Sequence, residues 1–169
     1  MKHLLFLFLT LLWFSAQAQS DNALPVRQSY KLSLPVEKNS AYEMDVPATP
    51  YVQNQSIVQI YPGETIYLEA EEKDGKLVLT SVREIKDSSK TITVTCTQTV
   101  TKGKHENVML KVTNPFNKSL TYSARMFHMK ANKWIATNVL PVQPNLTAFE
   151  MWPDVIITFG LSNWQLSSK

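Results

Sequence analysis

The chain has 169 residues, of which 44% are hydrophobic and 18% charged, and its formal net charge is +3. Four glycines, nine prolines and one cysteine exclude the collagen-like, disulfide-scaffold and disordered classes. One cysteine cannot form an internal disulfide, and the small, scattered charge argues against a nucleic-acid partner. We expect a single domain that builds its core without a covalent staple.

The first 18 residues have the features of a secretory signal peptide. Lys2 and His3 precede an apolar run at residues 4–14, and Ala16-Gln17-Ala18 supplies the small residues of a cleavage site. The run is too short to span a bilayer, and the mature chain offers no second candidate. Cleavage after Ala18 leaves 169 minus 18, or 151, residues with 16 basic and 14 acidic side chains. The sequence therefore predicts a secreted or periplasmic protein.

Residues 19–50 are weakly patterned and rich in proline, with Pro25, Pro35, Pro47 and Pro50. Because proline cannot donate to a central ladder, this region is predicted to be an extended arm or a set of edge strands. The weak strand candidates within it are residues 30–34 and 41–46.

Apolar and polar residues alternate from Thr65 onward, as expected of half-buried antiparallel strands. At residues 91–100, Ile92, Val94, Cys96 and Val100 share one face with a single polar residue, Gln98. Threonines occupy the other face, at Thr91, Thr93, Thr95, Thr97 and Thr99. We therefore predict a strand here with Cys96 as a buried, reduced thiol.

Similar patterns predict further strands separated by turn-forming pairs. These strands are expected at 57–61, 65–71, 76–85, 107–113, 120–130, 133–139, 146–151 and 155–166. Asp74-Gly75 is the strongest hairpin signal, because both residues tolerate the positive φ angles of a type I′ turn. No segment has a sustained helical period, so the prediction is an all-β, antiparallel sandwich of about nine to eleven strands over residues 51–169.

A resemblance to a known group adds to this prediction. The residues at 113–126 read Thr-Asn-Pro-Phe-Asn-Lys-Ser-Leu-Thr-Tyr-Ser-Ala-Arg-Met, and they are followed by Val-Leu-Pro-Val at 139–142 and Phe-Glu-Met-Trp-Pro at 149–153. This text resembles uncharacterised secreted bacterial proteins with an immunoglobulin-like fold, over residues 91–166. The resemblance implies an immunoglobulin-like sandwich in a bacterial envelope and supplies no active site.

Soft metal ligands are present but poorly spaced. A blue-copper site would combine Cys96 with two histidines, yet the upstream His3 leaves with the signal peptide and His105 lies nine residues downstream. Met126 and His128 share a strand face, whereas Met129 points the other way. We expect these residues to pack in the core or at its rim, with no bound metal or cofactor.

Acidic residues gather around the predicted Asp74-Gly75 hairpin, at Glu69, Glu71, Glu72, Asp74 and Glu84. Their spacing matches no calcium loop, and strand alternation explains them as a solvated face. The motifs G-x-S-x-G and H-E-x-x-H are both missing from the sequence. The protein is therefore expected not to be an enzyme, with a hydrolase of unrecognised site as the remote alternative.

Trp134, Trp152 and Trp164 form the candidate binding surface. Exposed rings could hold a sugar or a peptide, whereas buried rings would close the ends of the sandwich. We predict an interaction or structural module with a protein partner, and the alternative is a glycan-binding module that uses the tryptophans. Sequons for N-glycosylation occur at Asn54, Asn117 and Asn145.

Overall fold

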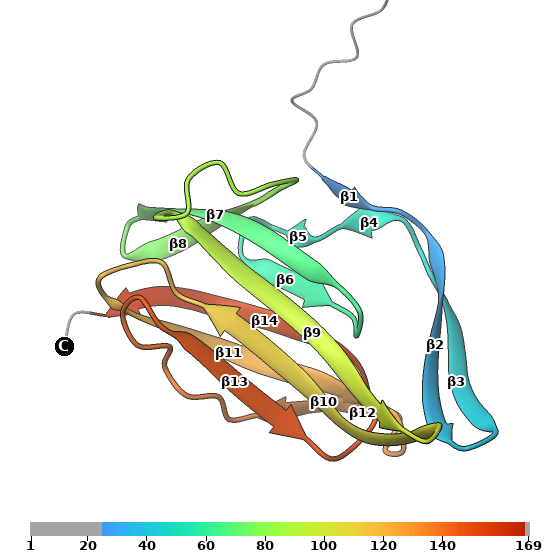
Figure 1. Ribbon diagram of the computed structural model, residues 1–169. Coiled ribbons are helices and arrows are strands. Elements are labelled where there is room, and N and C mark those ends of the chain that lie inside the picture. Colours follow the sequence, from blue (N-terminus) through green and yellow to red (C-terminus); the bar gives the residue numbers. More distant parts are fainter. Residues whose placement is uncertain (1–24, 168–169) are drawn as a thin grey trace, which may run out of the picture.

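The computed structural model describes residues 25–167, which form an all-β structure without a helix in that range (Figure 1). Two five-stranded antiparallel sheets pack face to face, and two small two-stranded sheets lie outside them. The predicted signal peptide falls outside the described residues. No helix within residues 25–167 is long and apolar enough to cross a membrane.

The first large sheet has the strand order β13–β10–β9–β7–β8. Its strands are β7 (Thr65–Lys73), β8 (Lys76–Val82), β9 (Thr91–Thr101), β10 (Lys104–Thr113) and β13 (Thr147–Trp152). The register places Val94 opposite both Ile66 and Val112. Apolar side chains of neighbouring strands therefore form continuous rows on the inner face.

The second large sheet has the order β12–β11–β14–β6–β5. Its strands are β5 (Val52–Gln53), β6 (Ile57–Ile60), β11 (Ser119–His128), β12 (Lys133–Thr137) and β14 (Ile156–Ser167). The inner faces of both sheets bury one apolar cluster, in which Ile92, Leu110, Phe159 and Leu161 are each 0% exposed. This core is what joins the two sheets, because apolar burial is the main favourable term in folding.

The predicted strands are present with their ends shifted by three residues at most. The three strands that sequence patterning missed are β1 (Val26–Arg27), β4 (Thr49–Pro50) and β5, each two residues long. The predicted turn at Asp74 and Gly75 is confirmed, since their φ angles are 51° and 73°. Two residues are too few to show an alternating pattern, so short strands leave no signal.

Strand β9 confirms the predicted inward face for most of its length. Ile92, Val94 and Cys96 are fully buried, but Val100 is 38% exposed. The reason is that β9 runs past the end of the core toward its turn with β10. Gln98 lies in this extension, where its amide nitrogen donates to the carbonyl of Pro35 at 2.8 Å.

The region predicted as an arm or edge strands forms the two small sheets. Strand β1 pairs with β4, and β2 (Tyr30–Glu37) pairs with β3 (Ser40–Val46). The β2–β3 hairpin descends along one end of the sandwich (Figure 1). It has a cluster of its own, in which Leu32, Leu34 and Val46 pack with Tyr61 and Ile157 of the sandwich. The hairpin is therefore docked, and its one proline, Pro35, lies outside the ladders of the two large sheets, as expected.

Candidate functional site

The three tryptophans proposed from sequence do not share a surface. Trp164 is only 2% exposed and stacks on Tyr122 with ring centroids 4.7 Å apart. Its assignment to a binding surface is therefore wrong, because it lies on the inward face of β14. Trp152 is partly buried against Phe159, and its indole nitrogen donates to the hydroxyl of Thr137 at 3.1 Å.

Trp134 is the tryptophan that reaches solvent, with 40% of its surface exposed. It lies on the outer face of the second sheet, with its ring edge-to-face against Phe127. A Cβ placed on Gly160 would lie 3.6 Å from this ring, so the glycine lets the indole lie close to the sheet. One exposed ring gives a smaller platform than the expected group of three.

The soft-ligand residues are dispersed in structural roles. Cys96 is fully buried, as predicted, and burial raises the pKa of its thiol. Met126 packs against the main core and Met129 against the hairpin cluster. No group of three or more His, Cys, Asp or Glu side chains within residues 25–167 has the arrangement of a metal site.

The two described histidines are engaged locally. The ring of His105 lies between the side chain of Gln98, at 2.9 Å, and the carbonyl of Pro153, at 3.1 Å. The Nδ1 of His128 accepts from the backbone N–H of Ala131, and its Nε2 lies 3.4 Å from a carboxylate oxygen of Asp154. These contacts connect turns, and neither ring has a hydroxyl or thiol nucleophile among its hydrogen-bond partners.

The acidic residues around the β7–β8 turn form a solvated face, as predicted. Glu71 pairs with Lys73 at 3.0 Å and Glu72 with Lys118 at 3.5 Å, and all four side chains are largely exposed. Exposed pairs of this kind contribute little to stability. The asparagines of the three sequons are likewise exposed.

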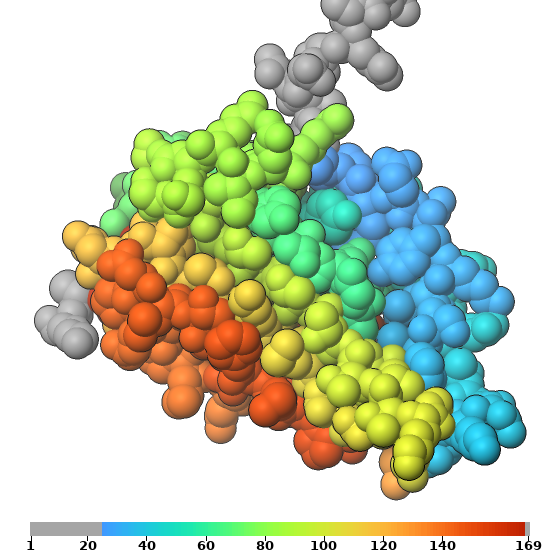
Figure 2. Space-filling model, viewed as in Figure 1, coloured from blue at the N-terminus to red at the C-terminus, as the bar shows by residue number. Residues whose placement is uncertain are grey.

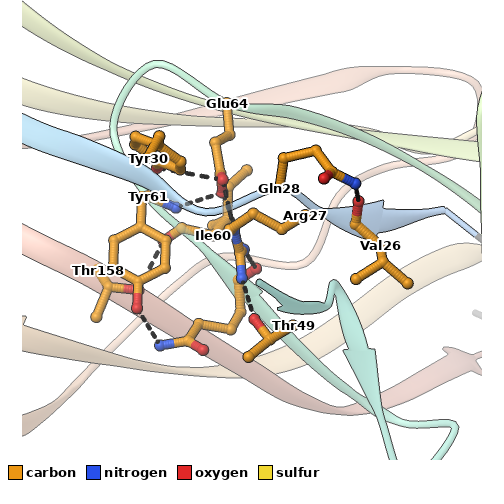
Figure 3. A network of polar contacts seen from close by, with 10 residues as sticks. Val26, Arg27, Gln28, Tyr30, Thr49, Ile60, Tyr61, Glu64 and Thr158 are labelled. Atoms are coloured by element: carbon orange, nitrogen blue, oxygen red, sulfur yellow. Dashed lines mark hydrogen bonds and ion pairs between the residues drawn. The ribbon is translucent and has the colours of Figure 1, made fainter. Parts of the chain in front are cut away.

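A buried ion pair that the sequence did not reveal joins the N-terminal segment to the sandwich (Figure 3). Arg27 of β1 is 1% exposed, and its Nε and Nη2 donate to the two carboxylate oxygens of Glu64 at 2.6 and 3.0 Å. The same guanidinium donates to the hydroxyl of Thr49 and to the carbonyl of Gln59. Because the two residues are 37 positions apart, no local sequence pattern predicts that they pair.

Aromatic rings enclose the pair. The guanidinium carbon of Arg27 lies 4.8 Å from the ring centroids of both Tyr51 and Tyr61, which is a cation–π distance. Tyr30 donates to Glu64 at 3.3 Å. Burial, and then the Glu64 charge, raise the pKa of the Tyr30 hydroxyl. We refer to Arg27, Glu64 and these three tyrosines as the arginine clamp.

The clamp has no chemistry left to offer a substrate. Both oxygens of Glu64 already accept two hydrogen bonds each, from Arg27 and Tyr30 on one and from Arg27 and the Tyr61 backbone on the other. A carboxylate in that state is neither a free base nor a free ligand. The arrangement is that of a structural fastener, which holds β1 and β4 on the sandwich.

The strongest candidate for an interaction surface is strand β13, at the edge of the first sheet. Its outer face carries Phe149 and Met151, which are 57% and 65% exposed. The flanking connection adds Leu146 at 58% and Leu140 at 73% exposed. Figure 2 shows the red-orange atoms of this part of the chain bordering the molecule away from the blue hairpin. Large apolar side chains gathered at one edge mark an interaction site more often than scattered ones do.

The backbone of β13 is also open on one side. The strand pairs with β10 along all six residues, and among residues 25–167 no further backbone hydrogen bond reaches it from the other side. It contains no lysine, arginine or proline, the residues that commonly protect edges. Its one charged residue, Glu150, accepts the backbone N–H of Leu140 at 2.9 Å.

Comparison of the chain with protein-family models, curated proteins and solved structures gives no match.

Proposed function

We propose that this protein is an exported, non-enzymatic interaction module that binds an extended polypeptide along the free edge of β13. The observation that carries the proposal is the coincidence of an open backbone edge with exposed Phe149 and Met151 on the same six-residue strand. In strand addition, main-chain hydrogen bonds supply affinity and alternate side chains supply specificity. We further propose an immunoglobulin-like sandwich of bacterial envelope type, on the resemblance carried by residues 113–126, 139–142 and 149–153.

Export is proposed from the leader alone. The basic start, the apolar run at residues 4–14 and the Ala16-Gln17-Ala18 site support cleavage after Ala18 and a secreted or periplasmic location. Intact-mass measurement of the exported protein tests this, with a mature chain that begins at Gln19 as the expected result. A protein that retains residues 4–14 would overturn the proposal of export.

Peptide binding tests the mode of recognition. We expect ten-residue peptides with alternating apolar residues, displayed on an array, to bind the purified protein, and N-methylation at alternate positions to abolish binding by removing main-chain donors. Phe149→Lys should weaken binding, whereas Thr80→Lys, the same charge change on the opposite edge strand β8, should not. Binding that survives both N-methylation and Phe149→Lys would rule out strand addition at β13.

Glycan binding is the alternative function, and it rests on the exposed Trp134 ring over Gly160. A glycan array that shows binding lost in Trp134→Ala, with folding intact, would replace the peptide proposal with this one. No glycan bound, together with peptide binding at β13, would exclude it.

A further inference from the structure

We propose that the strand added to β13 is β13 of a second copy of this chain, so that two first sheets join into one continuous sheet. This inference rests on the proposed function, because it names the partner of the same edge. It is argued from the order of side chains along residues 146–152, which are complementary to themselves when the strand is reversed.

An antiparallel pair must place residues of the same face opposite each other, because side chains alternate along each strand. Phe149 and Met151 lie on the outer face, and β10 confirms this alternation by pairing Lys111 with Phe149 and Met109 with Met151. A two-fold axis at Phe149 satisfies the requirement. It sets each Phe149 opposite its equivalent in the second copy.

This register also matches the neighbouring residues by type. Thr147 faces Met151 of the second copy on the outer face. On the inner face Ala148 faces Glu150, and Leu146, which precedes the strand and is 58% exposed, lies opposite Trp152. The small Ala148 leaves room for Glu150, whose side chain turns toward the backbone of Leu140. Every exposed apolar side chain of the segment then gains an apolar or small partner.

Charge disfavours the register shifted by two residues. It would set Glu150 opposite Glu150 and Leu146 opposite Asp154, and like charges directly opposite one another are destabilising. Pro144 and Pro153 lie just outside the paired segment, so no proline interrupts it. Charge therefore disfavours the register centred on Glu150, and the Phe149 pair across the axis favours the register centred on Phe149.

The other edges of the two large sheets are less suited to a second copy. The β8 edge is covered, because Leu79 N–H donates to the carbonyl of Gln55 at 2.8 Å. Strand β5 has two residues, and β12 begins with Lys133. A six-residue pairing is a small interface, so the dimer should be weak and form at high protein concentration.

Sedimentation velocity from about 10 μM to about 1 mM tests the proposal, a range chosen because small interfaces are weak. We expect a concentration-dependent dimer whose dissociation constant rises at least about tenfold in Phe149→Lys, where two lysines face each other across the axis. Thr80→Lys should leave the dimer unchanged. Circular dichroism and thermal unfolding serve to confirm that both variants fold.

Oxidation of single-cysteine variants tests the register. In a Cys96→Ala background, Phe149→Cys should form a disulfide dimer, since the two positions face each other, whereas Met151→Cys should not. A disulfide formed by Met151→Cys in place of Phe149→Cys would overturn the register.

A monomer at every concentration, or a dimer that Phe149→Lys leaves intact, would overturn the second-copy proposal. The proposed function is judged separately by the peptide array. A strictly monomeric protein that binds peptides through β13 keeps the function and removes only the second copy.

Discussion

The two edge strands of the first sheet, β8 and β13, differ in whether other parts of the chain cover them. At β8, the edge is covered by the β5–β6 turn through the Leu79–Gln55 hydrogen bond, and Ser81 donates to the carbonyl of Pro25 at 3.4 Å. At β13, the described residues add no backbone partner beyond β10, and the exposed side chains are Phe149 and Met151. One edge is closed by the N-terminal half of the chain, and the other is left open.

The contrast between the two edges is the basis for proposing β13 as the binding edge. The hydrogen bond from Ser81 of β8 to Pro25 requires that β1 stay on the sandwich, and the arginine clamp holds β1 there. An open edge is an association hazard that folded proteins normally protect. Protection of one edge and exposure of apolar residues on the other therefore support the proposal that β13 binds a partner.

The largest expected effect comes from removing the cation of the clamp. Arg27→Met should lower the free energy of unfolding by about 3–5 kcal/mol, because Glu64 would remain buried without its partner. Hydrogen exchange should also accelerate in β1 and β4, since the clamp would no longer fasten this pair of strands to the sandwich. Urea denaturation and hydrogen exchange measure the two effects.

The double variant Arg27→Met/Glu64→Leu is the control for this prediction. It should recover part of the lost stability, because an apolar pair can replace a buried ion pair without leaving a charge unpartnered. A change below about 1 kcal/mol in Arg27→Met alone would show that the clamp does not fasten β1 and β4 to the sandwich.

Alkaline pH should lower the free energy of unfolding through the Tyr30 hydroxyl of the arginine clamp. Burial and the Glu64 charge raise the pKa of the Tyr30 hydroxyl in the folded protein, while the unfolded chain titrates near the ordinary value of about 10. The unfolded state therefore loses its proton first, and the stability that Tyr30 contributes is present below about pH 10 and falls as pH rises above it.

Denaturation at pH 8, 9.5 and 11 checks this sign. The free energy of unfolding should decrease across the series, with a shallower decrease in Tyr30→Phe, which has no hydroxyl to titrate. A wild-type stability that increases above pH 10 would contradict the assignment.

Labelling of the Cys96 thiol tests whether the inner face of the first sheet is closed to solvent in the native protein. We expect a thiol reagent to label it slowly in the native protein and rapidly in denaturant, because it is fully buried and its pKa is raised by burial. Fast labelling of the native protein would mean that the first sheet opens readily.

The smallest effect on stability is expected at the open edge. Phe149→Lys should lower the free energy of unfolding by no more than about 1 kcal/mol, because the side chain is largely exposed and the cost comes mainly from placing a lysine opposite Lys111 of β10. Thermal unfolding at low protein concentration measures this. Destabilisation as large as that of Arg27→Met would show that Phe149 is a core residue and that β13 is not an open edge.

Sequence patterning was sufficient to predict the strands of the sandwich, but it did not predict the contacts that fasten the N-terminal segment to it. Alternation identified β9 and β14 because each has one face in the main core, and Asp74-Gly75 fixed a hairpin by its own chemistry. Arg27 and Glu64 could not be paired in advance, since an ion pair across 37 residues depends on tertiary structure. Trp164 was misplaced for a related reason, because composition cannot tell a buried ring from an exposed one.

The candidate site was anticipated only in general terms. An interaction module with a protein partner was expected, yet the binding edge could not be chosen without the strand order. Pairing β13 with β10, and not with its sequence neighbour β12, is what leaves Phe149 and Met151 at a border. Local sequence does not encode that choice, which follows from the packing of both sheets.

Hydrogen exchange of β13 and β8 at low and high protein concentration shows directly whether β13 is an open edge that accepts a strand. If β13 is an open edge that accepts a strand, its amides on the side away from β10 should exchange rapidly in dilute protein. They should gain protection at high concentration or with a bound array peptide, while β8 stays equally protected throughout. Slow exchange of all β13 amides in dilute protein, or protection gained at β8 in place of β13, would contradict the account.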